Sequence, residues 1–302
     1  MANIFTHPSS EKLLDELKIL FSSGDIKIKS DRHIVFVCGG SVSPRSRSMR
    51  YRFIKYAKNK LGRYRFLLVE AAMSDLSEHN DSPEFINIAA LEELVAELTD
   101  FLLIFQKSPG SFVGLEYFAN SKTTKKIFVV KDEKLQGESF ITLGPVDKIN
   151  KVSAFRPTLI VDYNESRPDF SGIEGRLLKL RSKYRKKLEL KPKGSVAVNA
   201  LLYVIYQVVS IFQYISIESI VTCVDKLFGK GHEEKARYVL SILIAANYVN
   251  RVGEDNNLFS VADIDDSFLE FTRPSLGDVK ASVILFYQKN HPDIYELIGS
   301  EL

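Results

Sequence analysis

The stretch from Phe101 to Asp132 constrains the fold of this chain more than any other part of the sequence. It begins with the apolar run FLLIF, which is typical of a buried strand, and it breaks at the small residues KSPGS. A helix-like segment follows over residues 112–120, and the β-rich run KIFVV comes next. This order predicts a βαβ unit of a parallel sheet. Ligands of such sheets bind where strand ends meet helix N-termini, so the turn at 107–111 and Glu116 form a candidate active site.

Further strands are expected before this unit. Residues 33–38 form an apolar run that leads into Gly39 and Gly40, and glycines let backbone N–H groups approach a nucleotide closely. A plain tight turn is the alternative for this pair. Residues 64–69 form another strand, which ends at Glu70, while the polar residues 74–83 are expected to be a loop and residues 84–98 a helix. The alternation of strands and helices predicts a doubly wound, mostly parallel α/β sheet.

A cluster of arginines follows the glycine turn. Its members are Arg45, Arg47, Arg50 and Arg52. Guanidinium groups beside a glycine turn could bind phosphates, because their planar fork matches phosphate oxygens. A solvated loop explains the same residues equally well, and the sequence leaves both interpretations open.

Composition sets the class of protein. The 302 residues allow two ordinary domains, and a content of 45% hydrophobic and 26% charged residues is typical of a globular protein. The net charge of +3 is too small to decide anything globally, so only the distribution of the charges is informative. Cys38 and Cys223 lie far apart in apolar runs, which predicts free thiols in a cytoplasmic protein and no metal site. Polar residues interrupt the apolar run at 199–217, so we expect a core helix and no membrane association.

The second half of the chain opens with a strongly basic segment. Between residues 176 and 193, leucines interleave with nine lysines and arginines, a pattern that predicts a basic amphipathic helix. Such a helix favours a polyanion, and the candidate nucleic-acid contacts are Lys183, Arg185, Lys186 and Lys187. A solvated linker helix is the alternative.

Residues 196–261 predict a compact arrangement of helices and strands. A long apolar helix is followed by a helix capped by Ser216, a helix over 233–246, and two runs, 247–252 and 258–261, that can pair as a hairpin. This order resembles a winged helix. The second helix of the pair carries mixed charges, so the partner of this domain could be nucleic acid or protein.

Several segments together resemble a known family. IVFVCGG, the strand that ends at Val69-Glu70, LEELVAELTD and SPGSFVGLEYFAN follow one another as in nucleoside deoxyribosyltransferase-like domains, and more narrowly as in effector proteins of bacterial retrons, which defend against phage. The resemblance covers roughly residues 30–150. It implies a transferase-like α/β domain over 1–165, a basic helical connector over 166–194 and a winged-helix-like domain over 195–302.

The resemblance also implies an activity. A retron effector of this kind would be a toxic N-glycosidase that cleaves NAD or a related nucleotide without a cofactor or metal. It would be held inactive by the retron reverse transcriptase and its RNA–DNA hybrid, in an assembly that could include further copies of the chain. The implied catalytic residues are Glu116, Glu70 and Asp100. The implied substrate contacts are Gly39, Gly40, Ser41, Arg50, Ser108, Gly110 and Ser111.

The sequence departs from the family pattern at its centre. The pattern SPGSFxELG places an acid where this chain has Gly114, and Glu116 stands where the pattern has glycine. On a regular helix a shift of two residues turns a side chain by about 200°. Glu116 therefore reaches a pocket only if the helix begins irregularly. A catalytically inactive nucleotide-sensing or scaffold protein is the alternative function.

Overall fold

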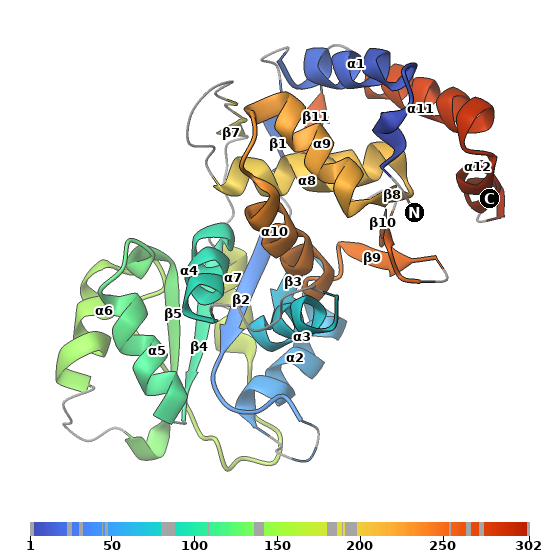
Figure 1. The fold of residues 1–302 in the computed structure, drawn as a ribbon. Coiled ribbons are helices and arrows are strands. Elements are labelled where there is room, and N and C mark those ends of the chain that lie inside the picture. Colours follow the sequence, from blue (N-terminus) through green and yellow to red (C-terminus); the bar gives the residue numbers. More distant parts are fainter. Residues whose placement is uncertain are drawn as a thin grey trace. The chain divides into compact units, whose positions relative to one another are not determined.

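The structure is a computed structural model, and it describes residues 3–22, 26–29, 33–43, 45, 48–79, 88–107, 109–135, 142–179, 186–188, 190, 198–253, 255–263, 267–271 and 275–300. The chain forms two compact units, each assembled from separate segments. The parallel-sheet unit consists of Asp31–Val69 and Glu92–Lys183, and the helical unit consists of Met1–Ser30, Glu70–Leu91 and Tyr184–Leu302. Figure 1 shows the elements of both units.

The parallel-sheet unit is built on five strands. They are β2 (His33–Cys38), β3 (Tyr64–Leu67), β4 (Phe101–Gln106), β5 (Ile127–Asp132) and β6 (Leu159–Val161). Every neighbouring pair is parallel, in the spatial order β3-β2-β4-β5-β6. The predicted parallel sheet is therefore confirmed, and the central strands are buried along nearly their whole length, as their apolar runs require.

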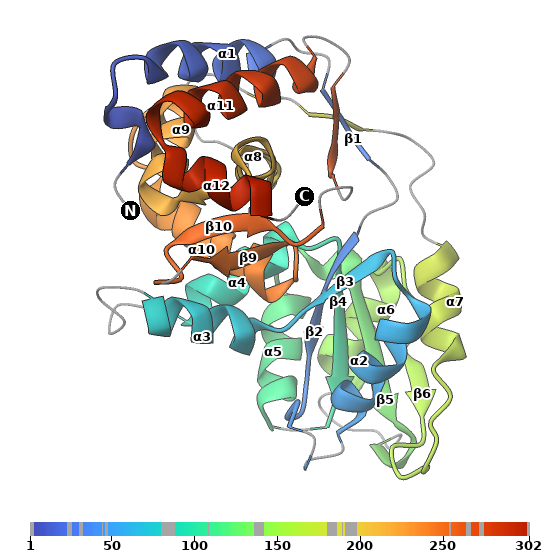
Figure 2. The ribbon, with the colours of Figure 1, turned by 90° about the vertical axis from the view of Figure 1, so that its right-hand side faces the viewer.

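Helices cover both faces of this sheet (Figure 2). Alternate strand residues such as Val35 and Phe105 pack with Phe53 of α2 (Met49–Lys60) and Leu177 of α7 (Ser171–Lys179) in one apolar cluster. On the opposite face α5 (Pro109–Ala119) packs against β4. Side chains alternate along a strand, so two covered faces explain why these strands are uniformly apolar. A short helix, α6 (Asp147–Val152), precedes β6.

The helical unit is centred on α8 (Val198–Phe212), whose side chains are almost all buried. Its other helices are α1 (Ser10–Ser22), α9 (Ile217–Phe228), α10 (Glu233–Ala245), α11 (Leu276–Asn290) and α12 (Pro292–Ser300). Two helices have residues in both units, α3 (Val69–His79) and α4 (Ile88–Leu98). In the part of the chain that the structure describes, no helix is long and apolar enough to cross a membrane.

Two small antiparallel sheets complete the helical unit. The first orders β8 (Ile215–Ser216), β10 (Leu258–Val261) and β9 (Val249–Val252) as β8-β10-β9. The expected helix pair and hairpin are present, and Ser216 caps α9 by accepting a hydrogen bond from the Ser219 amide at 3.3 Å. The second sheet orders β11 (Leu269–Phe271), β1 (Ile26–Ile28) and β7 (Lys186–Lys187) as β11-β1-β7.

Three expectations differ from the structure. Residues 74–79 are helical and not a loop, because Ala72 and Leu76 give α3 a small buried face. Of the basic helix expected over 176–193, the described residues up to Lys179 are helical as part of α7, whereas Lys186–Lys187 is a strand that pairs with β1. Residues 1–30, expected in the N-terminal domain, belong to the helical unit, where α1 packs on α9 and α11.

Candidate functional site

The carboxyl edge of the parallel sheet is the best-formed candidate site. If the five strands of this unit are numbered one to five along the chain, their order in the sheet is 2-1-3-4-5. In sheets of this order ligands bind between the first and third strands, where the direction of winding reverses. Those strands are β2 and β4. The turn after β2 and the start of α5 after β4 therefore flank the position where this fold class binds ligands.

The turn after β2 depends on glycine. Gly39 has φ +104° and Gly40 has φ +58°, both in the left-handed region. A Cβ at Gly39 would lie 2.1 Å from the carbonyl oxygen of Phe105 in β4, which is far inside van der Waals contact. The two chain segments thus approach as closely as backbones can, and a side chain at position 39 is excluded.

Arg50 contributes to this turn from the first turn of α2. Its side chain is buried, with 3% exposure, and its Nη1 donates to the Gly40 carbonyl oxygen at 3.2 Å. Ser48, the N-cap of α2, accepts from the Tyr51 amide at 3.1 Å and donates to the Ser41 carbonyl oxygen at 2.5 Å. Arg50 therefore belongs to the structured edge, whereas the side chain of Ser41 is exposed.

The start of α5 forms the other side of the edge. Gly110 lies in the first turn of this helix. Ser111 is buried, and its Oγ accepts a hydrogen bond from the Lys107 amide at 3.0 Å, so its hydroxyl fixes the local backbone. Ser108 lies outside the described residues. A helix N-terminus offers free N–H groups and a positive dipole end, which suit an anionic group.

A buried polar pair that sequence reasoning missed lies at the ends of β4 and β5. Gln106 and Lys131 are partners in the parallel register, so their side chains project from the same face. Gln106 is 2% exposed, and within the described part of the chain its Oε1 has no hydrogen-bond partner. Lys131 is 5% exposed, and burial lowers the pKa of its ammonium group. The sequence signal that could have identified this pair is a polar residue near the end of an apolar strand, as Gln106 is in β4 and Lys131 in β5.

Glu116 lies away from the start of α5. It is seven residues beyond Pro109 in a continuous α-helix, which places its backbone about 10 Å along the axis. Its side chain is exposed, and its Oε1 accepts a hydrogen bond from Asn120 Nδ2 at 2.9 Å. The Asn120 amide oxygen in turn accepts from Lys148 Nζ at 2.6 Å. These are the contacts of a surface helix acid.

The other two predicted acids lie at different places. Glu70 is exposed in the first turn of α3, which starts two residues after β3 ends at Leu67. Asp100 precedes β4, and its Oδ2 accepts from the Ile34 amide at 2.9 Å and lies 3.7 Å from His33 Nδ1. A six-residue strand is about 20 Å long, so the structure does not bring Asp100 to the glycine turn. Its contacts fix the start of β2.

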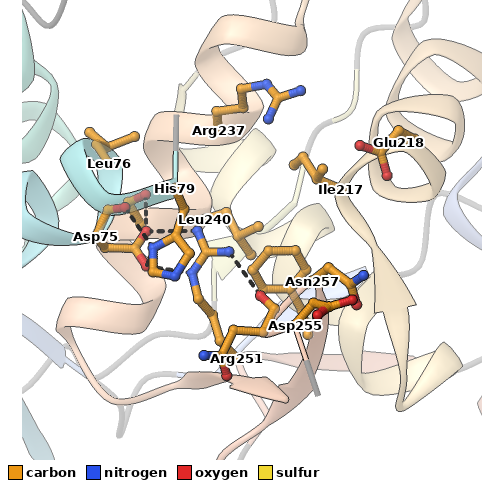
Figure 3. A pocket seen from close by; sticks show the side chains of 13 residues that line it. Asp75, Leu76, His79, Ile217, Glu218, Arg237, Leu240, Arg251, Asp255 and Asn257 are labelled. Atoms are coloured by element: carbon orange, nitrogen blue, oxygen red, sulfur yellow. Dashed lines mark hydrogen bonds and ion pairs between the residues drawn. The ribbon is translucent and has the colours of Figure 1, made fainter. Parts of the chain in front are cut away.

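A second polar cluster lies in the helical unit, around a cavity of about 290 Å³. Figure 3 shows Asp75, His79 and Arg251 directed toward one another there. The cavity is also lined by Arg237 and Ser241 of α10. Within the described residues, neither this cavity nor the sheet edge contains a group of three or more acidic, histidine or cysteine side chains that could hold a metal.

The predicted nucleic-acid contacts are described only in part. Lys183 and Arg185 lie outside the described residues. Lys186 and Lys187 form the edge strand β7, and Lys187 stands opposite Lys27 of β1 in the antiparallel register.

Comparisons with known proteins agree on one family. A family model described as STM3845 retron effector protein matches residues 46–251. Two similar proteins come from Escherichia coli. The "Retron Ec86 putative ribosyltransferase/DNA-binding protein" is 28% identical over 208 residues, or 66% of this chain and 64% of that protein. The "Retron Ec73 putative ribosyltransferase/DNA-binding protein" is 26% identical over 238 residues, or 72% of this chain and 75% of that protein.

Proposed function

Because the chain belongs to the STM3845 retron effector family, we propose that it is an effector enzyme of anti-phage defence that cleaves the N-glycosidic bond of NAD or a related nucleotide. The observation that carries this proposal is the carboxyl edge between β2 and β4. Gly39 has no room for a side chain there, and the buried Arg50 holds the Gly40 carbonyl. The word ribosyltransferase in the names of both relatives supports the same chemistry.

In this proposal the edge binds the nucleotide by its phosphates and its base. A phosphate would bind at the first turn of α5, at the positive end of the helix dipole, and the glycine turn would let the ligand approach the backbone of β2. The Oε1 of Gln106, which has no hydrogen-bond partner among the described residues, would accept a hydrogen bond from an amino or hydroxyl group of the ligand. In this proposal the parallel-sheet unit is a nucleoside deoxyribosyltransferase-like domain.

We assign the reactive carboxylate to Glu70 and not to Glu116. Cleavage leaves positive charge on the ribose C1 as the base departs with the bonding electrons, and a nearby carboxylate stabilises or attacks that centre. Glu70 lies in the first turn of the helix that follows β3, whereas Glu116 lies two turns into α5 and accepts a hydrogen bond from Asn120. Asp100 would serve the fold, since it anchors the Ile34 amide.

The helical unit would hold the enzyme in its retron complex. Its order of helix, strand, helix, helix and two strands resembles a winged helix, with α10 in the place of the recognition helix. Together with the lysines of β7 it would bind the reverse transcriptase and its RNA–DNA hybrid and keep the effector inactive until phage infection. The words DNA-binding in the relatives' names support a nucleic-acid contact.

The test is release of nicotinamide from NAD by the purified chain, measured by chromatography with and without the retron complex. Glu70→Gln keeps the size of the side chain and removes its charge, and we expect it to lower the rate by at least about 100-fold. Glu116→Gln is the matched control, and we expect it to stay within about threefold of wild type. Loss of activity in Glu116→Gln, with Glu70→Gln as active as wild type, would return the assignment to Glu116.

A second function is favoured by one observation. Gly114 occupies the position of the family's acid, so the domain could bind a nucleotide without cleaving it. Calorimetry with NAD separates the two functions. Binding with no nicotinamide released, alone or in the retron complex, would identify a nucleotide-sensing or scaffold protein.

A further inference from the structure

The cavity of the helical unit is a candidate binding site that the proposed chemistry does not use. Its volume is about 290 Å³, close to the lower limit of about 300 Å³ for sites that enclose a small molecule, so it has room for one or two side chains. The described residues that line it come from α3, α9, α10, β9, β10 and the turn between the last two strands, and all of them belong to the helical unit. The contacts that shape this cavity therefore lie within one unit.

The two arginines of the lining each have an acidic partner. Arg251 of β9 donates to the Asp75 carboxylate through Nε at 2.5 Å and through Nη2 at 3.2 Å, and Figure 3 shows these contacts. Arg237 Nη2 lies 2.9 Å from Glu233 Oε1, one turn earlier in α10. A guanidinium group that already binds a carboxylate attracts a phosphate only weakly, because the pair carries no net charge.

Two other acids of the lining have no such partner. Glu218 of α9 and Asp255 of the turn between β9 and β10 are exposed, and neither forms an ion pair among the described residues. Together with Asp75 they make three carboxylates against two guanidinium groups, which gives the described lining a formal charge of −1 with His79 neutral. The attraction that remains at this cavity is therefore for a cation.

An apolar wall accompanies these acids. Leu240 and Phe259 are each 2% exposed, and the half-buried Ile217 lines the cavity beside Glu218. The aliphatic stems of lysine and arginine pack on such a wall while the charged head stays in the polar part of the site. A phosphate has no apolar part that this wall could cover, so the wall also favours a basic side chain.

The backbone that carries the two acids is fixed by hydrogen bonds. Arg251 Nη1 donates to the carbonyl oxygen of Asn256, the residue after Asp255, at 3.3 Å. Glu218 lies in the first turn of α9, which Ser216 caps. Because this backbone is already fixed, little conformational freedom is lost when a ligand binds between the two acids.

We propose that this cavity binds a basic side chain, arginine or lysine, of a protein partner. The charged head of that side chain binds Glu218 and Asp255, and its stem packs on Leu240 and Phe259. The inference deepens the proposed function, because it assigns the surface between α10 and the β9–β10 turn to a protein of the retron complex and not to nucleic acid. It rests on that function only for the identity of the partner.

A small probe tests the site without any retron component. The probe is N-acetyl-arginine methylamide, and its neutral counterpart is N-acetyl-citrulline methylamide, which keeps the shape and lacks the charge. Nuclear magnetic resonance of the full chain should show concentration-dependent shifts of the amide signals of residues 217–218 and 255–259. We expect the arginine probe to bind about fivefold more tightly than the citrulline probe. Equal affinities, or no shifts at these residues, would overturn the inference.

Matched double variants show whether the two acids are responsible. The cavity variant, Glu218→Gln with Asp255→Asn, removes both charges. The control variant, Asp293→Asn with Glu296→Gln, removes two charges from exposed residues of α12, and Asp293 lies in the first turn of its helix as Glu218 does. We expect the cavity variant to lose the preference for arginine over citrulline and the control variant to keep it. The same preference in both variants would contradict the proposal.

Nucleic acid is the alternative ligand, and a short DNA duplex tests it. We expect Arg237→Ala to leave duplex binding within about twofold of wild type, because Arg237 is already paired with Glu233. We also expect the cavity variant to bind the duplex at least as tightly as wild type, since it lacks two negative charges. Weaker duplex binding in both would show that the cavity binds phosphates, and the proposal would be wrong.

The retron complex tests the identity of the partner. The cavity variant should bind the complex of reverse transcriptase and RNA–DNA hybrid about tenfold more weakly than the control variant does. The isolated cavity variant should still release nicotinamide from NAD at the wild-type rate. If the wild-type chain releases none, the proposed chemistry fails, whereas the two probes still decide the cavity. Equal affinity of both variants for the complex would overturn the assignment of the partner.

Discussion

Helices α3 and α5 each follow a parallel strand and each carry acids, yet the structure uses these acids differently. Asp75 of α3 is buried and receives three hydrogen bonds from α10 and β9. Glu116 of α5 is exposed and receives one from Asn120 of the next turn. The role of an acidic residue in a strand–helix unit therefore does not follow from its sequence motif alone. Its surroundings decide whether it holds the fold together, meets solvent or is available for chemistry.

The largest stability effect is expected at Arg251. Arg251→Ala leaves the buried Asp75 carboxylate with the hydrogen bond from Ser241 and with His79 Nδ1 at 3.8 Å, and we expect it to lower the free energy of unfolding by about 3 kcal/mol. Arg237 is the control, because it lies by the same cavity and pairs with Glu233 at 2.9 Å on the surface of α10. Arg237→Ala should cost less than about 1 kcal/mol. Urea unfolding measures both, and equal losses would mean that Asp75 is not a buried anchor.

An intermediate effect is expected at the start of α5. Ser111→Ala removes the acceptor of the Lys107 amide, and we expect a loss of about 1 kcal/mol, as for other hydroxyl groups that cap backbone N–H groups. Val113 of the same helix is 71% exposed, so Val113→Ala should stay within about 0.5 kcal/mol. A loss in Ser111→Ala no larger than in Val113→Ala would show that the turn does not need its hydroxyl.

The same contrast explains what the sequence could predict. The strands of the parallel sheet are apolar runs between turn residues, so β2, β4 and β5 were predictable from local pattern alone. The sequence did not predict helix α3, because most of its residues are polar and the residues that anchor it are distant in the chain. Asp75 bonds to Arg251, which lies 176 positions along the chain, and no local period encodes such a pair.

The candidate site also contains features that residue type predicts and features that depend on tertiary pairing. The glycine turn and the serine turn follow from residue type, because only glycine tolerates the backbone of Gly39 and because Ser111 bonds within its own turn. The pairing of Gln106 with Lys131 follows from strand register, which the sequence does not determine. The basic segment had a helical period, yet Lys186 and Lys187 pair with β1 from the chain's beginning. Tertiary pairing overrode the local pattern there.

The smallest effect is expected at Glu116, where the comparison with Asp75 is sharpest. Glu116→Gln keeps an acceptor for Asn120 and removes a solvated charge, so we expect the free energy of unfolding to change by less than about 0.5 kcal/mol. Asn120→Ala removes the link to Lys148 as well and should remain in the same range, since all these side chains are exposed. Urea unfolding at low and high salt measures both variants. A loss above about 1 kcal/mol would show that Glu116 is held as Asp75 is, and the difference between the two helices would disappear.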